Sequence, residues 1–151
     1  MSKTTRARTT TTGSPEPRPR RRAKAAADSG PAPAPGLPPE LTLSARAAHE
    51  KKANGVVVLD LRKAQAFTDY FFICTGQNAR QVKAIADAID TALANEGHTP
   101  AHVEGYDRAN WILLDYFTFI VHVFAPEARA FYDIERLWGS AERVEMPDPA
   151  A

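Results

Sequence analysis

The residues that can build a hydrophobic core are confined to one part of this 151-residue chain. All 13 aromatic residues lie between Phe67 and Trp138, whereas 8 of the 12 prolines lie in the first 40 residues. Residues 1–40 contain no Val, Ile, Phe, Tyr or Trp, so they have little apolar surface to offset the loss of chain entropy on folding. We therefore predict one folded domain over residues 41–140, a disordered Pro/Ala/Thr-rich tail over residues 1–40 and a C-terminal tail over residues 141–151.

Charge divides the chain in the same way. Residues 1–40 carry 8 Lys or Arg and 3 Asp or Glu, a balance of +5, and residues 41–151 carry 11 and 15, a balance of −4. The basic cluster at residues 18–24 could contact rRNA phosphates through counterion release. A solvated tail is the alternative that we favour, because no aromatic residue is interleaved with the arginines to stack on bases. A transit peptide is a third interpretation, which the many prolines oppose.

The sequence also bounds the environment of the domain. No run approaches the roughly 18 apolar residues that span a bilayer, and the N-terminus lacks the apolar core of a secretory signal. We expect a soluble protein of the bacterial cytoplasm with no membrane contact, and an organelle is the alternative because of the N-terminal extension. Cys74 is the single cysteine, so neither a disulfide framework nor a thiolate zinc site is expected. No cofactor is expected.

Periodicity predicts the elements of the domain. Short β-branched or aromatic runs at residues 56–61 and 70–76 are typical of buried strands. Apolar residues at three- and four-residue spacing predict a helix that is capped by Asn78 and ends at Gly97. A shorter helix is expected over residues 41–53.

The second half of the domain predicts more strands and a final helix. We expect a short strand at residues 100–103 and a hairpin from residues 111–116 and 119–124. The last helix begins at Pro126 and ends at Gly139. Its inward-facing residues are expected to be Phe131, Ile134, Leu137 and Trp138. The order α-β-β-α-β-β-β-α favours an α/β fold with a single mixed β-sheet and packed helices.

The residues support three catalytic hypotheses only weakly. Nucleotidyl transfer needs two carboxylates that converge on metal ions, but Asp60 has no acidic partner on its strand, and Asp133 and Glu135 diverge on a helix. A Cys74 nucleophile with His122 as its base is less favoured than a packing cysteine. His98 and His102 have a metal-like spacing, but Pro100 between them excludes a regular helix.

The turn at Gly76 is the remaining candidate for ligand chemistry. A glycine before a helix start lets a backbone approach an anion closely. Neither the dinucleotide fingerprint nor a P-loop accompanies it. A residual nucleotidyltransferase or nucleotide-binding module that uses the Gly76 turn is therefore the alternative function, and a tight turn into a capped helix is the simpler interpretation.

Trp111 is the best candidate for surface recognition. It begins a predicted strand directly after a polar stretch, where an indole can project from the rim of a sheet. Trp, Tyr and Arg are the residue types that most often anchor protein interfaces.

Several ordered motifs resemble one known family. They are VVLDL (57–61), TDYFFICTG (68–76), VEG (103–105), WILLDY (111–116), IVHVF (120–124) and RAFYDIERLW (129–138). Together they resemble the ribosomal silencing factor family, also called RsfS or Iojap. The resemblance covers residues 43–138, which is nearly all of the predicted domain and none of residues 1–40.

The resemblance implies a fold and a non-enzymatic function. It implies a nucleotidyltransferase-like fold without the catalytic carboxylates. It also implies binding to the large ribosomal subunit through ribosomal protein uL14, which sterically blocks the small subunit and represses translation when nutrients are scarce. Trp111 and Ile112 should then lie in the contact surface. The residues expected to shape or flank that surface are Asp69, Glu104, Asp115, His122 and Tyr132. A monomer or a weak homodimer is expected.

The chain departs from the family pattern at the tip of the hairpin. Many relatives have Gly-Asp there, whereas this chain has Phe117 and Thr118. We therefore expect a bulkier turn and transfer no contact made at the tip. The N-terminal tail is a second departure, since compact bacterial relatives lack one.

Overall fold

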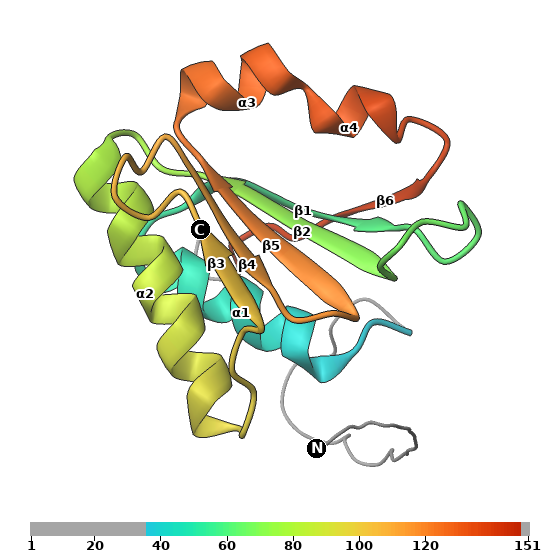
Figure 1. Cartoon of the computed structure of the whole chain (residues 1–151), viewed down its shortest axis with the longest axis horizontal. Coiled ribbons are helices and arrows are strands. Elements are labelled where there is room, and N and C mark those ends of the chain that lie inside the picture. The colour runs from blue at the N-terminus through green and yellow to red at the C-terminus, as the bar shows by residue number, and fades with distance from the viewer. Residues whose placement is uncertain (1–35, 149–151) are drawn as a thin grey trace. The chain divides into compact units, whose positions relative to one another are not determined.

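The computed structural model describes residues 36–148, and these form a mixed sheet with helices on both faces (Figure 1). The expected disorder of residues 1–35 lies outside the described residues. The elements in chain order are α1 (Pro39–Glu50), β1 (Asn54–Asp60), β2 (Tyr70–Thr75), α2 (Ala79–Asn95), β3 (His102–Glu104), β4 (Trp111–Asp115), β5 (Phe119–Phe124), α3 (Pro126–Tyr132), α4 (Ile134–Leu137) and β6 (Glu142–Glu145).

The sheet has six strands in the order β3-β4-β5-β2-β1-β6. β2 and β5 pair in parallel at its centre, and each of the other neighbours is antiparallel. The expected hairpin is formed by β4 and β5. The predicted α/β fold with a single mixed sheet is confirmed.

The two central strands are buried on both faces. Because successive side chains of a strand point to opposite faces, Phe72 of β2 and Val121 of β5 pack beneath α1 and α2. Phe71 and Ile120 pack in the second cluster, with residues of α3 and α4. These apolar strands therefore supply the cores of both layers, as their continuous hydrophobic runs predicted.

Helix α2 begins and ends where its sequence predicts. The side-chain oxygen of Asn78 accepts a hydrogen bond from the backbone N–H of Gln81 at 2.9 Å. Gly97 then takes a φ of +88°, and the N–H of His98 donates back to the Leu93 carbonyl at 2.9 Å. The cap and the glycine stop thus satisfy backbone groups that a helix end leaves unpaired.

The final helix differs from the prediction because it is broken. Asp133 takes the left-handed conformation, with a φ of +47°, and separates α3 from α4. The three- and four-residue spacing no longer keeps one face across this break. Ile134 is buried and Trp138 half-buried as expected, but Phe131 and Leu137 are 80% and 76% exposed, so their predicted inward orientation is wrong.

The predicted boundaries of the domain also change. Helix α1 begins at Pro39, inside the expected N-terminal tail. Residues 142–145, expected in the C-terminal tail, form β6, which pairs with β1 at the edge of the sheet. Its sequence, ERVE, offers little apolar alternation, because Val144 is its one apolar residue; Val144 is half-buried against the core, and the other residues of β6 are exposed.

Candidate partner-binding surface

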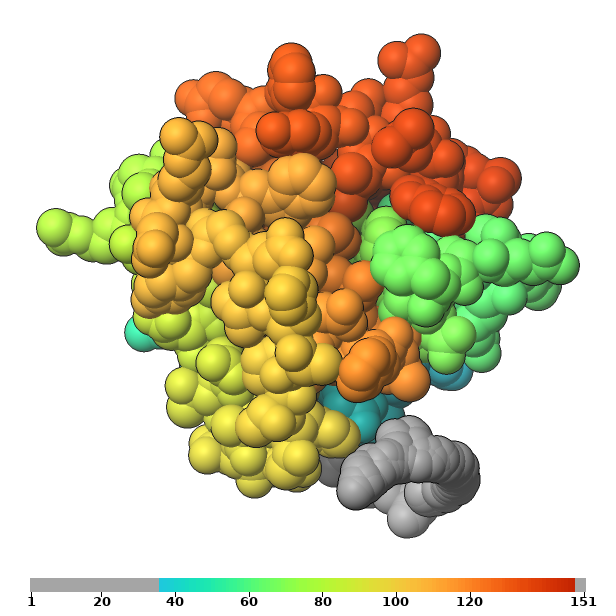
Figure 2. All heavy atoms as spheres, in the orientation of Figure 1, coloured from blue at the N-terminus to red at the C-terminus, as the bar shows by residue number. Residues whose placement is uncertain are grey.

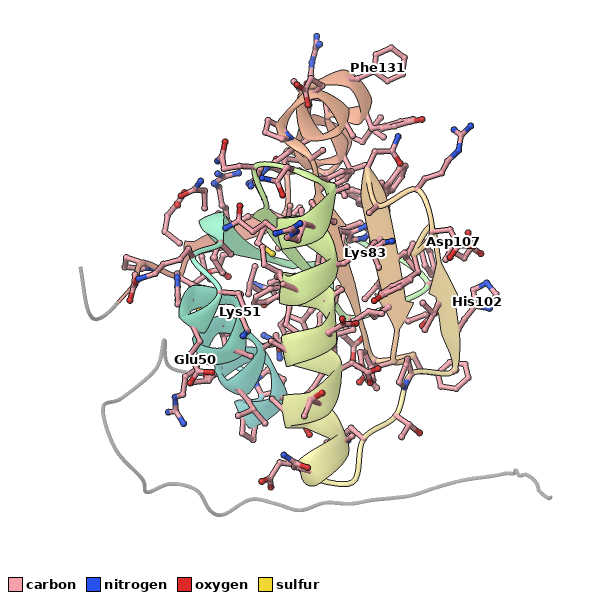
Figure 3. The ribbon with its side chains drawn as sticks, turned by 90° about the vertical axis from the view of Figure 1, so that its left-hand side faces the viewer. Glu50, Lys51, Lys83, His102, Asp107 and Phe131 are labelled. Atoms are coloured by element: carbon pink, nitrogen blue, oxygen red, sulfur yellow. The ribbon has the colours of Figure 1, made fainter. Side chains whose placement is uncertain are left out.

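Strand β4 presents two different faces. Ile112 and Leu114 are buried towards α1 and α2, whereas Trp111, Leu113 and Asp115 point to the opposite face and are half-buried. The helices α3 and α4 contribute Ala128 and Ile134 to the core over β1, β2 and β5. In Figure 2, the segment from β3 to β4 (yellow to orange) lies open to the viewer below α3 and α4.

We call this exposed region the Trp111 surface, and define it by the side chains that lie on or beside the outer face of β4. They are Glu104 of β3, Trp111, Leu113 and Asp115 of β4, and Tyr132 of α3. Leu113 lies opposite Glu104 on one side and His122 on the other. The surface is therefore apolar at its centre and carries carboxylates towards the sheet edge and the hairpin turn.

Trp111 is held by aromatic and polar contacts on three sides. Its ring stacks on Phe124 at a centroid distance of 5.0 Å and an angle of 29°, and Tyr132 lies 4.6 Å away. Its Nε1–H donates to Nδ1 of His122 at 3.0 Å. These contacts fix an indole that is still partly exposed, which is the geometry of an interface anchor.

His122 lies beneath the surface rather than on it. Its side chain is 4% exposed and packs edge-on against Phe71 at 4.6 Å. Burial lowers the pKa of His122 to about 3, so the ring is neutral and its Nδ1 is free to accept the indole hydrogen bond. The second nitrogen, Nε2, is buried and has no hydrogen-bond partner among residues 36–148.

The structure separates the other predicted site residues into two groups. Tyr132 lies against Trp111, and Glu104 lies opposite Leu113, two residues along β4 from Trp111. Asp69 and Asp115 lie near the hairpin turn, where the Asp69 N–H donates to the Thr118 carbonyl and Asp115 Oδ1 accepts from the Phe117 N–H. At about 3.3 Å per residue, that end of β4 is roughly 13 Å from Trp111.

The prediction that Ile112 contacts a partner is wrong. Its side chain is 0% exposed and belongs to the core beneath α1 and α2. Leu113 takes its place on the outer face. The signal was present in the sequence, because residues two apart on a strand share a face, and Leu113 and Asp115 lie two and four residues after Trp111.

Gly105 shapes the backbone beside Trp111. It has a φ of +79°, and a Cβ at this position would lie 2.1 Å from the carbonyl oxygen of Trp111. Only glycine combines that conformation with that close approach. The VEG motif therefore includes a residue that places the start of β4.

Comparison with known proteins identifies the family. Residues 35–151 match the family described as "Ribosomal silencing factor during starvation". A ribosomal silencing factor RsfS from Halalkalibacterium halodurans is 39% identical over 106 residues, which are 70% of this chain and 91% of that protein. This chain belongs to the ribosomal silencing factor family.

A plant protein is also similar to this family member. The chloroplastic protein Iojap of Zea mays is 35% identical over 106 residues, which are 68% of this chain and 45% of the maize protein. A crystal structure of a protein from Chromobacterium violaceum matches with a TM-score of 0.65 at 31% identity, and covers 75% of this chain and 91% of that chain. The family name describes a regulator of translation that acts on the ribosome, and not an enzyme.

Cys74 and His122 do not form the pair that one catalytic hypothesis required of this family member. Cys74 packs beneath α1 and α2, on the face opposite His122, and burial raises the pKa of its thiol to about 12. Within residues 36–148, no three His, Cys, Asp or Glu side chains gather as a metal site. Glu135 is instead held by Arg129 and Arg143, which lower its pKa to about 2.

The Gly76 turn is also explained by packing. A Cβ on Gly76 would lie 2.9 Å from the backbone nitrogen of Val82 and 3.0 Å from its Cγ2. The close approach that this glycine permits is therefore to the first turn of α2.

None of the helices within residues 36–148 is long and apolar enough to cross a membrane.

Proposed function

We propose that this chain binds the large ribosomal subunit through ribosomal protein uL14, and that the Trp111 surface makes the contact. The observation that carries this proposal is the fixed, partly exposed indole on the open face of β4. Family membership supports the ribosome as the partner. The volume of the bound domain would then block the small subunit from the same area of the large subunit. This steric block would repress translation under nutrient limitation.

Charge supports a basic protein partner. Residues 41–151 carry a balance of −4, and the Trp111 surface includes the carboxylates of Glu104 and Asp115. Complementary charge raises the association rate with a basic ribosomal protein more than it raises the final affinity. The phosphates of nearby rRNA would repel these carboxylates. The basic cluster at residues 18–24 would offset that repulsion by contacting the rRNA phosphates.

Co-sedimentation with purified large subunits tests the proposal. Trp111→Ala removes the anchor and is expected to weaken binding by at least ~2 kcal/mol, or roughly thirtyfold, while the domain stays folded. Tyr106→Ala is the matched control, because Tyr106 is an exposed aromatic whose hydroxyl donates to Asp87 on α2. Equal binding of wild type and Trp111→Ala would refute the assignment of the surface.

A second measurement tests the steric mechanism. Large and small subunits are mixed with the chain, and whole ribosomes are separated by gradient sedimentation. The wild-type chain should reduce the whole-ribosome peak, and Trp111→Ala should restore it.

The chain should act as a monomer or a weak homodimer in the cytoplasm of a bacterium, with an organelle as the alternative compartment.

A further inference from the structure

The indole of Trp111 uses its only hydrogen-bond donor inside the molecule. Nε1–H donates to Nδ1 of His122 at 3.0 Å. The direct cross-strand neighbour of Trp111 is Phe124, and that of His122 is Leu113, so the bond runs diagonally across the hairpin. Diagonal neighbours of an antiparallel pair are within reach of aromatic side chains.

We propose that His122 is a positioning residue, which holds the Trp111 indole against β5 so that the exposed part of the ring stays in place for the partner. This inference rests on the proposed function of the Trp111 surface. The planes of the indole and of the His122 ring lie within 34° of each other, and those of the indole and Phe124 within 29°. Tyr132 lies beside the indole at 4.6 Å.

The unpaired nitrogen of His122 argues that stability is not the reason for a histidine here. Nε2 carries the hydrogen when Nδ1 accepts, and this buried donor has no partner among residues 36–148. A buried donor without a partner destabilises a fold. An apolar side chain would avoid that cost in a pocket lined by Phe71 and Phe124. The hydrogen bond to Trp111 is the contact that only a side chain with an acceptor can make.

The arrangement restricts what the partner presents to Trp111. Because the indole N–H is already bound, a hydrogen-bond acceptor on the partner gains nothing at this position. The exposed part of the ring instead suits an aliphatic or a basic side chain, and a basic one is favoured by the balance of −4 that residues 41–151 carry.

Two variants of the full chain separate positioning from packing. In His122→Asn, the amide oxygen can occupy the place of Nδ1 and accept the indole hydrogen bond. His122→Leu is similar in size and has no acceptor. The readouts are the Trp111 indole resonance in ¹H–¹⁵N NMR, assigned with Trp138→Phe, together with the thermal midpoint and co-sedimentation with large subunits.

We expect His122→Leu to shift the Trp111 indole proton upfield, to keep a thermal midpoint at or above that of His122→Asn, and to weaken binding at least fivefold. His122→Asn should retain the indole resonance and bind within twofold of the wild type. Three outcomes would each overturn this inference while leaving the proposed function standing. The first is that His122→Leu binds within twofold of the wild type, and the second is that His122→Asn binds as weakly as His122→Leu. The third is that His122→Leu unfolds. A wild-type chain that does not co-sediment would overturn the proposed function, and the inference with it.

Discussion

Arg129 joins four parts of the domain and should contribute strongly to its stability. Its guanidinium donates to both carboxylate oxygens of Glu135 at 2.9 Å, to the Gly55 carbonyl at 2.8 Å and to the Thr75 hydroxyl at 2.9 Å. The side chains of Arg129 and Glu135 are 16% and 17% exposed. Arg129→Leu would remove all four hydrogen bonds and leave a mostly buried carboxylate with Arg143 as its remaining partner.

The pKa of Glu135 gives the size of the effect. Arg129 is the largest cause of its lowering from 4.5 to about 2, and Arg143 adds to it. At ~1.4 kcal/mol per pKa unit, the full lowering corresponds to roughly 3.5 kcal/mol of stability at neutral pH. Part of this belongs to Arg143, so we expect Arg129→Leu to lower the free energy of unfolding by about 2 kcal/mol at pH 7.

The pH dependence has a definite sign. The pKa of Glu135 is lower in the folded state, so its stabilisation is present above pH 4.5 and is lost as the pH falls towards 2. The difference between wild type and Arg129→Leu should therefore shrink by roughly half by pH 3. Urea unfolding at pH 7 and at pH 3, followed by circular dichroism, measures both differences.

Arg143→Leu is the matched control. Arg143 pairs with the same Glu135 carboxylate, but its side chain is 45% exposed. An exposed pair of this kind contributes about 0–1 kcal/mol. A loss on Arg143→Leu equal to that on Arg129→Leu, or a loss on Arg129→Leu that does not change with pH, would refute this account of the network.

Three further predictions test single features of the fold. Gly105→Ala should lower the free energy of unfolding by about 2 kcal/mol or more in urea titration, because its Cβ would overlap the Trp111 carbonyl at a φ of +79°; an unchanged midpoint would contradict this. Phe117→Gly should raise stability by about 0.5–1 kcal/mol in thermal unfolding, since Phe117 has a φ of +72° and is 73% exposed; destabilisation would show that the Phe117 ring matters more than its backbone. Cys74 should resist a thiol reagent at pH 8 until the domain unfolds, because burial raises its pKa to about 12; rapid labelling of the folded chain would disprove it.

Much of the fold could be predicted because local residues decide it. The apolar runs of β1, β2 and β5 are buried strands, and Asn78 and Gly97 bound α2 as their side-chain and backbone chemistry requires. The helix break at Asp133 could not be read in this way. A left-handed residue ends α3 there, and the apolar spacing of Phe131 and Leu137 resembles that of a buried face although both are exposed.

The candidate site was also predictable only in part from the sequence. Trp111 and Tyr132 could be selected from residue type and motif, and the structure brings them together at 4.6 Å. The family resemblance implies that Ile112 lies with Trp111 in the contact surface, but the alternation of a strand puts Ile112 in the core and Leu113 on the surface. That alternation follows once a strand is assigned, because adjacent residues of a strand point to opposite faces of the sheet.

The sequence by itself determined most of the strands and helices and the family to which the chain belongs, because each depends on neighbouring residues or ordered motifs. Only the tertiary structure decided that β6 completes the sheet, that Arg129 reaches Glu135, Gly55 and Thr75, and that His122 accepts the hydrogen bond of Trp111. These contacts join residues on different elements. Their formation depends on strand order, register and the faces that the pleat assigns, and a local pattern specifies none of those three.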